Sequence, residues 1–186
     1  MQKFSKTEYL APHGSLITAA KVVPKIGNLA LTGDDSGVVS VWRFDSERPL
    51  LNFSGNGSSI SAVNFLAKPT LAVAGTQSGS VNIWDLETQK VHASVKGHRA
   101  ACNLIVPFQT DTTFVATCAA DKTIKIWDLR KKGSVATYKG HTSNITSAEL
   151  SPDCRWIAAG DESGSLKLWD LSTGKVFQEF DHANQS

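Results

Sequence analysis

The segment IKIWDLRKKG, from Ile124 to Gly133, contains the pattern that decides the fold of this chain. Apolar residues alternate with other residues up to a Trp-Asp pair, which is typical of a half-buried β-strand. Three basic residues and a glycine follow at once, and such a sequence is typical of a turn. The segment therefore predicts a strand that ends at the Trp-Asp pair and runs into a turn.

Three other segments repeat this pattern at a nearly constant spacing. SVWRF, NIWDL and KLWDL carry Trp42, Trp84 and Trp169, so that the four tryptophans are separated by 42, 43 and 42 residues. A histidine or an asparagine precedes each tryptophan by 28 or 29 residues; these are His13, Asn56, His98 and His141. Each unit reads as four short strands with turns between them, and no helical periodicity of useful length is present. Four strands in 42 or 43 residues predict a blade of a β-propeller.

Composition and charge exclude several classes of protein. The chain has 186 residues, 41% of them hydrophobic, and a net charge of +2, which predicts a soluble globular protein. This charge is too small for a nucleic-acid partner, and the first ten residues lack the apolar run of a signal peptide, so we also expect no membrane partner. Cys102, Cys118 and Cys154 are odd in number and form no C-x-x-C pair. They indicate no zinc site and no disulfide framework, and they favour the cytoplasm.

These motifs and their spacing resemble the WD-repeat family, and the resemblance extends from about His13 to Phe180. It implies an all-β fold, a WD-repeat β-propeller in the form of an open arc of four four-stranded blades. Under this interpretation, residues 1–186 contain an N-terminal strand at 3–10 and blades at 13–54, 55–96, 97–139 and 140–181.

The resemblance also implies a buried chain of hydrogen bonds in each blade, formed by a histidine, a hydroxyl residue, an aspartate and the tryptophan. Only the third blade carries all four at the expected positions, as His98, Thr117, Asp121 and Trp127. In the first blade, Ser36 stands where the acid is expected. In the second blade, Asn56 replaces the histidine, Ala74 the hydroxyl residue and Ser78 the acid. In the fourth blade, Ala159 replaces the hydroxyl residue and Ser163 the acid. We expect these departures to weaken blades two and four, and Asp121→Ala to destabilise the chain more than Ser163→Ala.

An enzyme is an alternative reading of the same residues. His98, Thr117 and Asp121 have the types of a base, a nucleophile and an orienting acid, but a packed blade uses these groups to satisfy one another. A nucleophile also needs exposure and a set of oxyanion donors, and the sequence shows neither. We therefore expect no catalytic residue.

Acidic pairs and glycine-rich turns give no stronger signal for chemistry. The pairs Asp34-Asp35 and Asp161-Glu162 fall in equivalent turns of two blades, where charged residues are usually solvated. The glycines of GDDSG and GTQSG precede no helix, so they do not indicate a phosphate site. We expect no metal and no cofactor.

Recognition of protein partners therefore falls to the loops at the two ends of the propeller. The end that carries the blade entrances is predicted to show Asp35, Arg99, Asn144 and Glu162. The opposite end is predicted to show Arg130, Lys131 and Lys132, the densest positive cluster in the sequence. This basic cluster is either a solvated turn closed by Gly133 or a contact with an acidic partner.

A narrower resemblance concerns the last three blades. VAGTQSGSVNIWDLETQKV, IKIWDLRKKGSVATYKGHT and LKLWDLSTGKVFQEF are similar to the second to fourth blades of the regulatory WD-repeat subunits of katanin. The resemblance implies a partner of an AAA ATPase that severs microtubules, and a location at the centrosome and spindle poles. Such subunits bind the katanin catalytic subunit through a C-terminal helical domain that this sequence lacks, so microtubules and tubulin are the partners that it predicts here.

A second class of partner is also possible. The segment IWDLR, from Ile126 to Arg130, resembles the box with which some WD-repeat proteins dock on the adaptor of a cullin-type ubiquitin ligase. That resemblance implies a substrate receptor, and it requires Arg130 to be free at the end opposite the blade entrances.

The number of strands predicts an incomplete ring. Lys3 to Leu10 have the position of the strand that joins the final blade in this family, and Asp181 begins a fifth unit that stops at Ser186. The sequence therefore predicts a truncated or alternatively ended product whose outer blades expose apolar faces. Such faces favour self-association.

Overall fold

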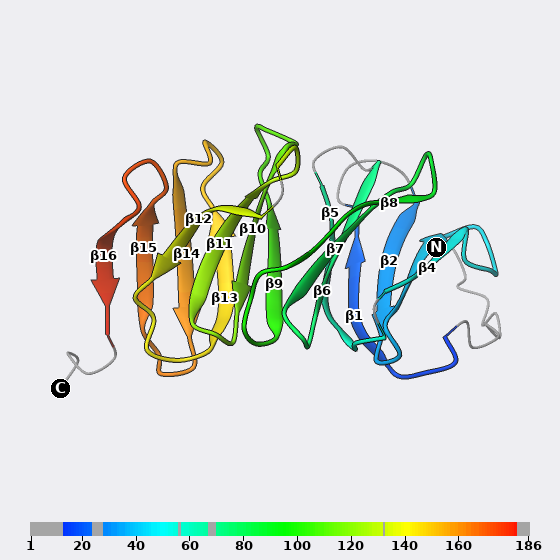
Figure 1. Cartoon of the computed structure of the whole chain (residues 1–186), viewed down its shortest axis with the longest axis horizontal. Helices are drawn as coiled ribbons and strands as arrows, with labels where there is room; N and C mark the ends of the chain where they lie inside the picture. The colour runs from blue at the N-terminus through cyan, green and yellow to red at the C-terminus, as the bar shows by residue number, and fades with distance from the viewer. Residues whose placement is uncertain (1–12, 24–27, 56, 67–69, 132, 182–186) are drawn as a thin grey trace, which may run out of the picture.

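The structure is a computed structural model that describes residues 13–23, 28–55, 57–66, 70–131 and 133–181. These residues form sixteen strands in four antiparallel sheets of four strands each. Figure 1 shows the sheets side by side in one row, with the first sheet at one end and the fourth at the other. The prediction of an all-β open arc of four blades is confirmed. The expected strand at 3–10 lies outside the described residues. Within these residues, no helix has the length and hydropathy needed to span a membrane.

Each sheet is formed by four strands that are consecutive in the chain. The first sheet contains β1 (Ile17–Val22), β2 (Leu29–Asp34), β3 (Val38–Arg43) and β4 (Leu51–Ser54). The second contains β5 (Ile60–Phe65), β6 (Leu71–Thr76), β7 (Ser80–Asp85) and β8 (Lys90–Lys96). The third contains β9 (Cys102–Pro107), β10 (Phe114–Ala119), β11 (Thr123–Asp128) and β12 (Ser134–Lys139). The fourth contains β13 (Ile145–Leu150), β14 (Trp156–Asp161), β15 (Leu166–Asp170) and β16 (Lys175–Phe180).

The turn between the second and third strands has the same backbone geometry in all four sheets. Gly37, Gly79 and Gly164 adopt a positive φ at equivalent positions of the first, second and fourth sheets. Lys122 adopts a φ of 67° at this position of the third sheet. Glycine adopts this conformation without a steric penalty, which explains its use at the other three turns.

The hydrophobic core lies between neighbouring sheets. One cluster joins Val81 and Ile83 of β7 to Cys102 of β9 and Val115 of β10, and Trp127 of β11 belongs to the same cluster. The other two clusters join the first sheet to the second and the third sheet to the fourth. Because each sheet buries an apolar face against the next, the sheets hold their end loops at fixed spacing.

Candidate functional site

The third sheet contains a continuous chain of buried side-chain hydrogen bonds. The Nε1–H of Trp127 donates to Thr117 Oγ1 at 2.7 Å, and Thr117 Oγ1 lies 2.7 Å from His98 Nε2. The Nδ1 of His98 lies 3.1 Å from a carboxylate oxygen of Asp121. An ionised carboxylate only accepts, so His98 carries its proton on Nδ1 and donates to Asp121. The His98 Nε2 then accepts from the Thr117 hydroxyl, which itself accepts from the indole. The predicted set of four residues is therefore assembled in this blade.

The charge states of this chain follow from its environment. Burial lowers the pKa of His98, although the neighbouring Asp121 acts in the opposite direction. Burial would raise the pKa of Asp121, but hydrogen bonds from the Thr123 side chain and the Arg99 backbone, together with His98, outweigh this and lower it. A neutral histidine therefore lies beside an ionised carboxylate. Thr117 is fully buried and already bonded to two partners, so its hydroxyl is not available to a substrate.

The first sheet contains the same chain, although the sequence did not predict which residue supplies its acid. Trp42 Nε1–H donates to Thr32 Oγ1 at 2.7 Å, Thr32 Oγ1 lies 2.6 Å from His13 Nε2, and His13 Nδ1 lies 2.7 Å from Asp34 Oδ2. The expectation that Ser36 replaces the acid is wrong. Asp34 lies two residues earlier in the turn than expected, and Ser36 donates to it at 2.7 Å.

The fourth sheet contains an incomplete version of the chain. His141 Nδ1 lies 2.9 Å from Asp161 Oδ2, so Asp161 supplies the acid and Ser163 only donates to it. Ala159 offers no hydroxyl, and within the described residues His141 Nε2 and Trp169 Nε1 have no hydrogen-bond partner. Burial would raise the pKa of Asp161, but hydrogen bonds from Ser163 and His141 outweigh this and lower it. The expectation that Asp34 and Asp161 are solvated turn residues is also wrong, because both are buried.

The fourth sheet has room for the missing hydroxyl. The ring centroids of His141 and Trp169 are 6.4 Å apart, against 6.3 Å and 6.1 Å for the same pair in the third and first sheets. Ala159→Thr is therefore expected to raise the free energy of unfolding by about 1–3 kcal/mol, because it gives partners to two buried polar atoms. Urea unfolding measures the change, with Ala159→Val as the control that adds volume without a hydroxyl. An equal gain in the valine variant would contradict the assignment.

The predicted basic cluster is partly neutralised by an acid beside it. Arg130 Nε and Nη2 donate to the buried carboxylate of Asp128 at 2.9 and 3.0 Å, and Lys131 Nζ lies 3.8 Å from it. The hydrogen bond from Arg130 lowers the pKa of Asp128 to about 2. The guanidinium also lies 5.8 Å above the centre of the Phe114 ring. Lys132 lies outside the described residues. The described part of the turn therefore presents two cations that are already paired.

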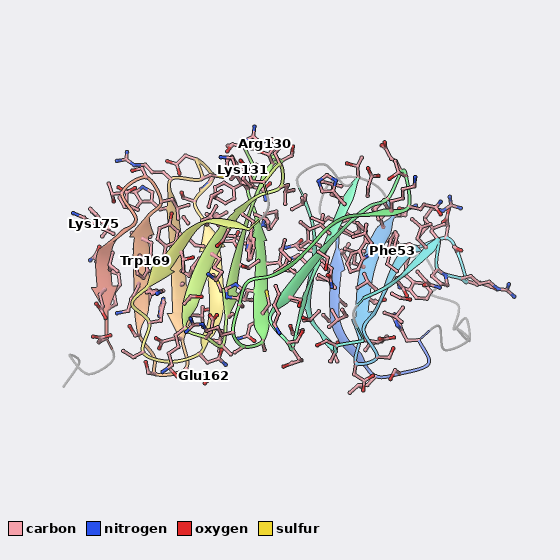
Figure 2. The ribbon with its side chains drawn as sticks, in the orientation of Figure 1. Phe53, Arg130, Lys131, Glu162, Trp169 and Lys175 are labelled. Atoms are coloured by element: carbon pink, nitrogen blue, oxygen red, sulfur yellow. The ribbon has the colours of Figure 1, made fainter. Side chains whose placement is uncertain are left out.

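The opposite end of the molecule carries the other predicted surface residues. Figure 2 shows Glu162 at one end of the sheets and Arg130 and Lys131 at the other. Asn144 Nδ2 donates to Glu162 Oε1 at 2.7 Å, and Ser15 donates to Asp35. These hydrogen bonds tie the turn between the second and third strands to the blade entrance in both outer sheets. Asp35 and Glu162 are thus exposed but held in place.

A basic pocket near Arg99 was not predicted from the sequence. It has a volume of about 420 Å³, and its charged lining residues are Arg99, Lys122, Lys125, Lys139 and Asp121. The antiparallel register sets Lys125 opposite Thr137 and Thr123 opposite Lys139, which brings together cations that are far apart in sequence. Within the described residues, none of the four cations forms an ion pair, and no group of three or more potential metal ligands occurs. The pocket therefore has the charge to hold an anion.

Four-stranded blades, a Trp-Asp pair in three of them and buried histidine chains define a WD-repeat propeller. The chain belongs to this family: the model of the WD domain, G-beta repeat, matches residues 47–85, 89–128 and 132–170, which is more than half of the chain.

Three curated proteins illustrate what this chain is similar to. The transcriptional corepressor LEUNIG_HOMOLOG of Arabidopsis thaliana is 28% identical over 92% of this chain and 21% of its own length. Autophagy-related protein 16 of Arabidopsis thaliana is 28% identical over 80% of this chain and 29% of its own length. Protein groucho of Drosophila melanogaster is 26% identical over 53% of this chain and 13% of its own length. The chain spans less than a third of each of these relatives.

Proposed function

We propose that this chain is a non-catalytic protein-interaction scaffold that binds an acidic segment of a partner protein at the pocket near Arg99. The charge of this pocket carries the proposal, because four cations line it and its single acid, Asp121, is already hydrogen-bonded to His98. Arg99, Lys122 and Lys139 are exposed, so a partner reaches them without rearrangement of the blade. Complementary charge of this kind gives specificity and speeds association.

The resemblance to the regulatory subunits of katanin suggests which partner this is. We propose the acidic tails of tubulin, with the scaffold acting in the targeting of microtubule severing at the centrosome and spindle poles. The katanin catalytic subunit is then a further partner, bound through a region outside this sequence. The match to the WD-domain model and the charge of the pocket both support an interaction role.

Neutralising the pocket provides the test. The triple substitution Arg99→Gln, Lys122→Gln and Lys139→Gln is expected to weaken co-pelleting with microtubules about tenfold, since each exposed charge contributes roughly 0.5 kcal/mol. Binding of the unaltered chain is expected to fade as salt rises through about 0.15 M, because exposed charges are screened.

The basic turn at the other end supplies a matched control. A second triple variant, Arg130→Gln, Lys131→Gln and Lys132→Gln, removes the same charge, and it is expected to change binding little because Asp128 already pairs with two of these residues. A loss in this variant alone would assign the contact to the turn. Unchanged binding in both variants, or no binding of the unaltered chain, would overturn the tubulin proposal.

A substrate receptor of a cullin-type ubiquitin ligase is the second candidate. One observation favours it: the Arg130 side chain is 65% exposed at the end opposite Glu162. Its guanidinium donates to Asp128 and is therefore not free as this function requires, so an adaptor would have to compete with Asp128 for it. A pull-down with the purified ligase adaptor tests this function. Failure to bind, or binding that Arg130→Ala does not reduce, would exclude it.

A further inference from the structure

The three contacts between neighbouring sheets share one arrangement. At each contact, the later sheet in the chain packs on the earlier one. The residue that begins the first strand of the later sheet lies against the second strand of the earlier sheet, and we call it the inserted residue. A Cβ atom at Gly33 would lie 2.8 Å from Ile60 Cβ, and a Cβ atom at Gly75 would lie 2.6 Å from Cys102 Sγ, so each glycine forms a socket for that side chain. At the third contact, Ile145 and Cys118 are fully buried in one cluster.

A hydrogen bond between the sheets accompanies each of these contacts. Thr18 Oγ1 donates to the carbonyl oxygen of Ile60 at 2.5 Å, and Ser61 Oγ donates to that of Cys102 at 2.6 Å. At the third contact, Asn103 Nδ2 donates to the carbonyl oxygen of Ile145 at 2.8 Å. Each donor is the second residue of the first strand in its own sheet. In the fourth sheet the residue at this position is Thr146, which is exposed.

The fourth sheet presents an empty socket on its outer face. Gly160 occupies the position of Gly33 and Gly75, and among the described residues a Cβ atom there would meet only Ser147 of its own sheet. Beside it, Leu166 is 42% exposed, whereas its equivalents Val39, Val81 and Ile124 are fully buried under the next sheet. Phe180, which pairs with Leu166, is also exposed. We call this surface, formed by Gly160, Leu166, Phe180 and Thr146, the socket face.

The first sheet lies at the other end of the row (Figure 1), and it carries the side chain that matches this socket. Ile17 pairs with Asp34 as Ile145 pairs with Asp161, so it holds the position of the inserted residue. It is 47% exposed, whereas Ile60, Cys102 and Ile145 are fully buried. The two ends of the row therefore carry the two halves of a contact that the molecule forms three times internally.

We propose that the socket face docks on the first sheet of a second copy of this chain. Ile17 of one copy packs on Gly160 and Leu166 of the other, and Thr146 donates to the carbonyl oxygen of Ile17. Two such contacts close a two-fold symmetric ring of eight blades, which is within the range of known propellers. Closure uses both ends of each copy, so association stops at two copies rather than continuing as a filament.

Light scattering of the purified chain tests this pairing. We expect a discrete species of about twice 20.0 kDa, and a monomer or an open-ended series of masses would overturn the proposal. Gly160→Leu fills the socket and adds apolar surface, and it is expected to abolish the dimer. A merely sticky surface would associate as much or more with this substitution, so retained association overturns the proposal.

Two further variants establish which faces meet. Ile17→Asp is expected to abolish the dimer by disabling only the first sheet. A mixture of Ile17→Asp and Gly160→Leu chains retains one intact pair of faces, so it is expected to form mixed dimers that neither variant forms alone. Val91→Asp is the matched control, because Val91 is 60% exposed on β8, which belongs to neither end sheet. Circular dichroism shows that each variant is folded; loss of the dimer in the control, or no mixed dimer, would contradict the pairing.

Discussion

Gly97→Val is expected to lower the free energy of unfolding by about 3 kcal/mol or more, because the new side chain would occupy the space of the Trp127 ring. A Cβ atom at this position would overlap the edge of the indole, with Trp127 Cζ2 only 2.9 Å away. Trp127 is buried and donates to Thr117, so displacing it removes packing and a hydrogen bond together. Urea unfolding followed by tryptophan fluorescence measures the loss.

The same substitution at two other glycines shows how far the effect depends on contact with a tryptophan. Gly140 precedes the blade-entrance histidine of the fourth sheet as Gly97 does in the third, and its nearest neighbour is Trp169 Cη2 at 2.8 Å. Trp169 has no hydrogen bond to lose within the described residues, so Gly140→Val is expected to cost less. Gly14 has no neighbour within 4 Å in the part of the chain that the structure describes, and Gly14→Val is expected to change stability by less than about 0.5 kcal/mol. Equal losses in all three variants would show that the tryptophan contact is not responsible.

The four-bladed fold could be predicted because its signals repeat. The tryptophans recur every 42 or 43 residues, and a two-residue strand period between turn sequences leaves few alternatives to an antiparallel sheet. A single unit would give a weak signal, but four units in the same order support one another. Within the described residues, each sheet of the fold consists of four consecutive strands, as the repeat predicts.

The buried acids were only partly predictable, since a turn can supply its carboxylate from more than one position. Asp121 lies six residues before its tryptophan, while Asp34 and Asp161 lie eight residues before theirs, yet all three reach the histidine. A rule that fixed the position at six therefore assigned Ser36 and Ser163 wrongly. The side chain of an aspartate reaches several backbone positions within one turn, so spacing alone does not identify it.

The basic pocket was not predictable from local sequence. Lys125 and Lys139 are separated by a turn and come close only because β11 and β12 pair in one particular register. The Arg130 cluster, by contrast, is contiguous in sequence and was found easily, but the sequence did not reveal that Asp128 neutralises part of it. Density of charge in a sequence thus differs from the charge that a folded surface offers to a partner.

Asp121→Ala is expected to lower the free energy of unfolding by about 2–3 kcal/mol, because it leaves His98 Nδ1–H and the Arg99 backbone N–H without their acceptor. Asp161→Ala is expected to cost a similar amount, whereas Ser163→Ala removes only one donor to Asp161. Urea unfolding at pH 7 compares the three variants. A loss in Ser163→Ala as large as that in Asp161→Ala would contradict the assignment of Asp161 as the acid of the fourth sheet.

The pH dependence of the stability of Asp121→Asn shows whether the Asp121 carboxylate stabilises the chain through its charge or through its shape. The pKa of Asp121 is lowered from its ordinary 3.8, so its ionised form stabilises the folded chain above this pH, and the contribution is lost as the pH falls through the folded value. Burial lowers the pKa of His98 from 6.5, so protonation favours the unfolded chain and stability already declines below pH 6.5. The stability gap between Asp121→Asn and the unaltered chain is therefore expected to be full near pH 7 and to close below 3.8. A gap that stays constant as the pH falls to about 2 would show that the carboxylate acts through its shape and not through its charge.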